Sequence, residues 1–69
     1  MNQELIDAIY EIRDDAVALQ EKIGAMKNMQ NLTPGQIEKV FQLGNGLRGF
    51  RGINLGEMAV AAGIDIRKF

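Results

Sequence analysis

Apolar residues in the first third of the chain recur at alternating spacings of four and three. This pattern repeats every seven residues, which places all of its members on one face of an α-helix. The members of this apolar seam are Leu5, Ile9, Ile12, Ala16, Leu19, Ile23 and Met26. The positions farthest from the seam are polar: Asp7, Asp14, Glu21 and Asn28. The pattern therefore predicts one long amphipathic helix, from about residue 2 to residue 28, whose seam has to be buried.

A second helix is predicted to begin at Pro34. Thr33 and Gln36 have the spacing of a capping box, in which each side chain bonds the backbone of the other residue. Proline is also favoured at the first helical position. We expect this helix to span residues 34–43 and to end at Gly44, because glycine commonly terminates helices.

The following segment, residues 44–52, contains four glycines. Each glycine inside a helix costs about 1 kcal/mol relative to alanine. We therefore expect a loop here, the alternative being a helix that continues to Phe50. A third helix is predicted over residues 55–62, with Asn54 as its N-terminal cap and Gly63 as the residue that ends it.

The size of the chain bears on how the seam is buried. A chain of 69 residues forms one small domain, and it has no cysteine for disulfides and no histidine for a zinc site. We expect residues 1–30 to act as a dimerisation helix, with residues 31–69 folding back over it. The alternative is that the long helix packs only on its own chain. Two short helices could shield one side of a helix of about 33 Å, but we do not expect them to shield the full width of its apolar stripe, so an all-α dimeric bundle is predicted.

Charge along the long helix favours one orientation of the pair. Residues 1–15 carry five acidic residues and one basic residue, whereas residues 16–30 carry one acidic and two basic residues. An antiparallel pair would place acidic ends against basic ends, so we expect an antiparallel homodimer.

The residue types present argue against catalysis. The chain has no histidine, cysteine or serine, so the usual pairs of nucleophile and base cannot be assembled. We expect no enzyme activity, no cofactor and no bound metal. Acidic residues on the outer face of the long helix are best explained by solvation, although they could imitate nucleic acid toward a basic partner: Asp7, Glu11, Asp14 and Asp15.

Two arginines and an aromatic residue stand out in the glycine-rich segment. Arg48, Phe50 and Arg51 could bind an acidic protein surface, or grip phosphates and stack on a base. The alternative is that Phe50 completes the core while both arginines face water.

The stretch LGEMAVAAGIDIRKF, residues 55–69, resembles the front of a bacterial helix-turn-helix motif. Met58 and Ala59 would lie in its first helix, and Ala62, Gly63 and Ile64 would form the turn. In that motif the second helix supplies the base contacts, but here only one turn of chain remains for it. The resemblance implies DNA binding through basic contacts at Arg48, Arg51, Arg67 and Lys68.

Together these patterns predict a small non-enzymatic protein that binds another protein as a homodimer. Chains of this size often serve as accessory regulators, including inhibitors carried by phages and mobile elements. One alternative is a nucleic-acid-binding regulator with a truncated helix-turn-helix, and another is a structural or assembly subunit. No apolar run approaches the ~18 residues of a membrane span, and the N-terminus lacks a signal-peptide pattern, so we expect a cytoplasmic protein.

Overall fold

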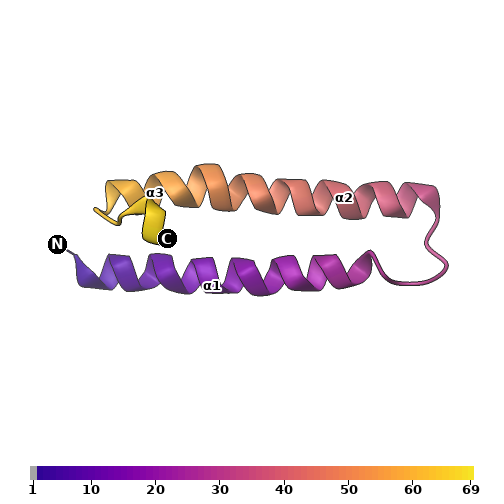
Figure 1. Cartoon of the computed structure of the whole chain (residues 1–69), viewed down its shortest axis with the longest axis horizontal. Helices are drawn as coiled ribbons and strands as arrows, with labels where there is room; N and C mark the ends of the chain where they lie inside the picture. The colour runs from indigo at the N-terminus through magenta and orange to yellow at the C-terminus, as the bar shows by residue number, and fades with distance from the viewer. Residues whose placement is uncertain (1) are drawn as a thin grey trace.

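The computed structural model describes residues 2–69, which form a hairpin of two long helical arms. The arms run antiparallel and are joined by a loop of residues 27–33 (Figure 1). The first arm is α1, and the second arm comprises α2, η1 and α3 without a break. The element bounds are α1 Gln3–Met26, α2 Pro34–Gly49, η1 Phe50–Leu55, α3 Gly56–Ala61 and η2 Ile66–Lys68. No strand occurs within residues 2–69, so the predicted all-α class is confirmed.

The first arm agrees with the predicted long helix. The Asn2 side chain caps its N-terminus by accepting a hydrogen bond from the backbone N–H of Leu5 at 3.1 Å. The helix ends at Met26, with Lys27 as its C-cap. The predicted range of residues 2–28 thus differs from the structure only at the fraying ends.

The start of α2 is the one that the capping box predicts. The backbone N–H of Gln36 donates to the Thr33 hydroxyl at 3.1 Å, and the backbone N–H of Thr33 donates to the Gln36 side chain at 2.9 Å. Pro34 occupies the first turn, where its missing N–H costs nothing. The two capping hydrogen bonds and the fixed φ of proline therefore favour a helix that begins at Pro34.

The predicted glycine-rich loop over residues 44–52 is wrong, because this segment is helical throughout. The second arm is one bent helix of 28 residues, so the predicted helix end at Gly44 is also wrong. The physical reason is tertiary packing, which outweighs the low helix propensity of glycine. At Gly44 a Cβ atom would lie 3.9 Å from Cγ2 of Ile23, so this residue sits directly against α1.

The middle of the second arm is a π-helix, η1, which joins two α-helical stretches. A π-helical turn takes in more residues than an α-helical turn and often marks a functional position. Asn54 lies inside η1, and α3 begins with no side-chain cap. The predicted helix start with Asn54 as a cap is therefore wrong, because the chain is already helical when it reaches this residue.

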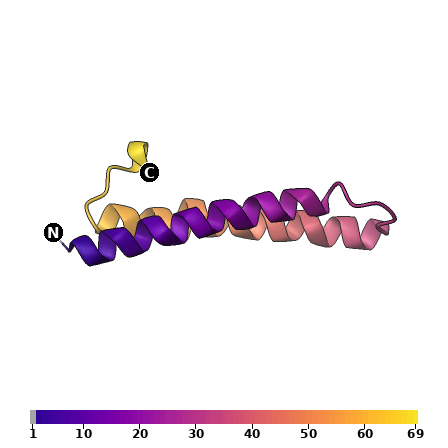
Figure 2. The same ribbon diagram turned by 90° about the horizontal axis from the view of Figure 1, so that it is seen from below.

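The end of the second arm follows the prediction for Gly63. This residue has a φ of 84°, a conformation that glycine adopts without strain. The backbone N–H of Ile64 donates to the Ala59 carbonyl at 2.9 Å, and that of Gly63 donates to the Val60 carbonyl at 3.0 Å. These two bonds form a Schellman motif, which reverses the chain. The C-terminal segment then lies to one side of the two arms (Figure 2).

The best-packed region lies at the open end of the hairpin, opposite the loop. Ile9, Leu55 and Ala59 form a buried cluster there. Around this cluster pack partly buried residues from α1 and the C-terminal segment: Leu5, Ala62, Ile64 and Phe69. The cluster therefore packs the N-terminal half of α1 against the end of the second arm and the C-terminal segment.

The apolar seam of α1 is only partly used within the chain. Ile9 and Ala16 are each 2% exposed, whereas Ile12 is 43% and Leu19 50% exposed. The second arm runs alongside α1 for most of its length (Figure 1), but it leaves part of the width of the apolar stripe exposed. The exposed part of the seam remains available for a partner.

Within residues 2–69 no helix combines the length and the apolar character that crossing a membrane requires.

Candidate functional site

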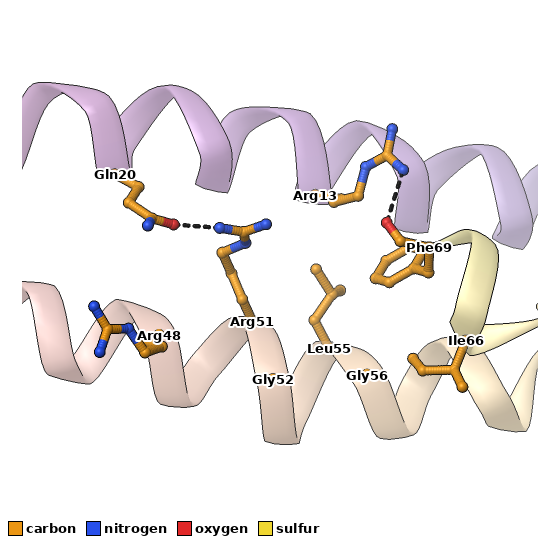
Figure 3. A pocket seen from close by; sticks show the side chains of 9 residues that line it. All are labelled: Arg13, Gln20, Arg48, Arg51, Gly52, Leu55, Gly56, Ile66 and Phe69. Atoms are coloured by element: carbon orange, nitrogen blue, oxygen red, sulfur yellow. Dashed lines mark hydrogen bonds between the residues drawn. The ribbon is translucent and has the colours of Figure 1, made fainter.

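A cleft opens between the two arms beside the C-terminal segment, with a volume of about 480 Å³. We call it the arginine cleft, because three arginines and a glutamine line it (Figure 3). Its polar lining comes from both arms, with Arg13 and Gln20 on α1, Arg48 on α2 and Arg51 on η1. The rest of the lining is apolar or lacks a side chain: Gly52, Leu55, Gly56, Ile66 and Phe69.

Arg13 lies between two aromatic rings at one end of the cleft. Its guanidinium carbon is 4.8 Å from the ring centre of Tyr10 and 5.5 Å from that of Phe69. The two rings are themselves 5.4 Å apart in an edge-on arrangement. Arg13 also donates to the Phe69 carbonyl at 3.0 Å and forms a salt bridge with Asp14 at 2.9 Å. The contacts of Arg13 therefore hold the C-terminal segment against α1.

The other two arginines have charges that no acid compensates. Arg51 reaches across the hairpin and donates to the side-chain oxygen of Gln20, which is uncharged (Figure 3). Within residues 2–69, neither Arg48 nor Arg51 forms a salt bridge, and no acidic side chain lines the arginine cleft. Both guanidinium groups are therefore available to bind an anion.

The structure brings together only two members of the predicted group Arg48, Phe50 and Arg51. Residues three apart on a helix share a face, so both arginines line the cleft. Phe50 is 42% exposed and does not line it, because a residue two positions away points to another side of the helix. Phe50 therefore lies outside the cleft that the two arginines line, and its role in binding a partner stays a prediction.

Sequence reasoning missed the residues that complete the cleft. Arg13 and Gln20 are seven residues apart, so the heptad pattern already places them on one face of α1. That spacing was the signal available for the α1 side. Phe69 gave no comparable signal, since its position depends on the turn at Gly63 and on the path of the chain after it.

The acidic residues of α1 lie on its exposed surface. Asp7, Glu11, Asp14 and Asp15 are all exposed, and Asp7 accepts a hydrogen bond from Gln3 at 2.8 Å. In the part of the chain that the structure describes, no three residues of metal-ligating type gather closely enough to hold an ion.

The segment that resembles the front of a helix-turn-helix does not continue into a second helix within the described residues. Residues Ile66–Lys68 form a single 3-10 turn, η2, after which Phe69 packs against Tyr10. Arg67 forms a salt bridge with Asp65 at 3.1 Å. Hydrogen bonds from the Arg67 side chain and backbone hold the pKa of Asp65 below its ordinary value of 3.8.

A second hollow, the apolar groove, lies between the arms nearer the loop and shares no lining residue with the arginine cleft. Its volume is about 630 Å³. Its lining is Leu19, Ile23, Lys39, Gln42, Leu43, Gly46 and Leu47. The hollow is continued toward the loop by another, also bordered by Lys39 and Leu43, that reaches Met26, Leu32 and Val40. Leu19 of α1 and Leu43 of α2 are thus exposed along one groove, and Ile23 and Leu47 are partly exposed there.

Comparison with known proteins gave no match to a protein-family model, to a curated protein or to a solved structure.

Proposed function

We propose that the chain is a small non-enzymatic interaction protein, which acts as a homodimer and binds another protein to alter its activity. The observation that carries this proposal is the amount of surface that one chain leaves exposed. The exposed area of the chain is 5283 Å². A compact monomer of this mass exposes about 4,300 Å², so the excess is about 1,000 Å². A standard protein interface buries about 800 Å² on each partner.

The shape of the chain supports the same proposal. Its dimensions are 50 × 17 × 16 Å, and its radius of gyration is 14.8 Å. A compact domain of this length would have a radius of gyration of about 11 Å. Two such hairpins packed face to face would form a four-helix bundle. This bundle would be wider than a single hairpin of the same length, and therefore less elongated.

The apolar surface supports a second copy as the occupant of the groove. Five apolar residues are buried, whereas twelve large apolar residues are exposed within the described chain. Those on α1 are seam residues or their neighbours: Ile12, Val17 and Leu19. A two-fold axis across the groove would place Leu19 and Leu43 of one chain against the partner's groove. The same residues of each chain would then form the interface.

Substitution in the groove tests this proposal. Leu43→Glu places a charge in the groove, and we expect it to shift the chain from dimer to monomer in sedimentation velocity. Val60→Glu is the matched control, because Val60 is 58% exposed and lies outside the groove. If Leu43→Glu and Val60→Glu sediment alike, the groove is not the dimer interface.

A further inference from the structure

We infer that the arginine cleft binds a single carboxylate that stands beside an apolar side chain on a partner protein. This inference rests on the proposed interaction function and names the chemistry of the partner. The groove and the cleft have no lining residue in common, so a dimer formed through the groove leaves the cleft open.

The charge of the cleft calls for an anion. Arg48 and Arg51 present two guanidinium groups from one helix face, and neither has an acidic partner within residues 2–69. Arg51 is half-buried and bonded to the neutral Gln20 side chain, so its positive charge has lost part of its water without gaining an opposite charge. A carboxylate is recognised well by such groups, because its two oxygens match the paired N–H donors of arginine.

The rest of the cleft suits an apolar group attached to that anion. Leu55 is 5% exposed and forms the floor, while Ile66 and Phe69 stand on the side of the C-terminal segment. Gly52 leaves the hollow open, since a Cβ added there would meet nothing within 4 Å. The volume of about 480 Å³ lies within the range of ligand pockets, about 300–1,000 Å³.

The neighbouring charges favour a single carboxylate over a nucleic acid. The hollow next to the cleft is bordered by Asp14 and Glu21 as well as by Arg13 and Arg51. A phosphate backbone carries a charge at every nucleotide and would be repelled by these carboxylates along its path. A single carboxylate held at Arg48 and Arg51 avoids them.

Nuclear magnetic resonance of the arginine side chains tests the inference directly. The probe is the dipeptide acetyl-Glu-Phe-amide, and its neutral counterpart is acetyl-Gln-Phe-amide. We expect the glutamate dipeptide to shift the Nε–H signals of Arg48 and Arg51 saturably, with the signal of Arg67 unchanged. Replacing two of the three cleft arginines together, Arg48→Gln with Arg51→Gln, should weaken binding at least about tenfold, because charged hydrogen bonds are lost.

Arg67→Gln is the matched control, since it removes one arginine that lies outside the cleft and is 86% exposed. Its affinity for the glutamate dipeptide should equal that of the unaltered chain, and circular dichroism verifies that all variants are folded. Equal binding of the two dipeptides would overturn the inference, because the charge would then play no part. Tighter binding of a single-stranded oligonucleotide at physiological salt would also overturn it, in favour of nucleic acid.

The molar mass of the same samples separates this inference from the proposed dimer. A monomer that binds the glutamate dipeptide at Arg48 and Arg51 contradicts the dimer and supports the cleft. A dimer whose Arg48 and Arg51 signals do not respond supports the interface in the groove and contradicts the cleft.

Discussion

At the scale of single residues, Phe69 connects the C-terminal segment to α1. Its ring contacts Tyr10 and the guanidinium group of Arg13, and its carbonyl accepts a hydrogen bond from Arg13. It also packs against the buried cluster around Leu55. One wall of the arginine cleft therefore depends on this one aromatic residue.

We expect Phe69→Ala to lower the free energy of unfolding by about 1–2 kcal/mol, because an aromatic pair and a cation–π contact are lost. Urea denaturation at a fixed protein concentration measures this change. Arg67→Ala is the control, since its side chain is exposed, and should change the free energy of unfolding by less than about 0.5 kcal/mol. Equal effects of the two substitutions would mean that Phe69 does not pack on α1.

The Asp65 carboxylate gives a prediction for pH. Its pKa is lowered by hydrogen bonds from Arg67, so the folded form favours the ionised carboxylate. This contribution to stability is present above the ordinary pKa of 3.8 and is lost as the pH falls through the lower, folded value. A carboxyl-carbon titration by nuclear magnetic resonance should give a midpoint below 3.8. In Arg67→Gln the midpoint should rise, and an unchanged midpoint would exclude Arg67 as the cause.

At the scale of helices, the sequence predicted the beginning of α2 and the end of α3, because capping depends on neighbouring residues. It predicted the extent of α1 from the apolar pattern. It did not predict that residues 44–52 are helical. Four glycines there disfavour a helix locally, and the compensating contacts come from α1, as at Gly44 against Ile23. Arg48 and Arg51 were identified from the sequence. Their separation from Phe50 depends on this segment being a helix, so it was not predicted.

Two glycine substitutions distinguish a helix from a loop in this segment. Gly49→Ala should raise the free energy of unfolding by about 0.5–1 kcal/mol, because alanine favours a helix and a Cβ there would meet nothing within 4 Å. Gly63→Ala should lower it by about 1–2 kcal/mol, since Gly63 has a φ of 84°. Thermal denaturation measures both. If Gly49→Ala does not stabilise the chain, residues 44–52 do not form the helix described above.

At the scale of the whole molecule, the elongated shape and large exposed surface of the hairpin support the proposed dimer. The excess of acidic residues in residues 1–15 and of basic residues in residues 16–30 favours a dimer in which the two copies of α1 run antiparallel.

The most direct test of the account is the molar mass of the unaltered chain, measured by light scattering during size-exclusion chromatography at micromolar concentration. The chain has a mass of 7.6 kDa, and a dimer packed through the apolar groove predicts a value twice as large. A higher oligomer would indicate a structural or assembly subunit. A mass of 7.6 kDa would show that the groove stays uncovered and would contradict the central claim.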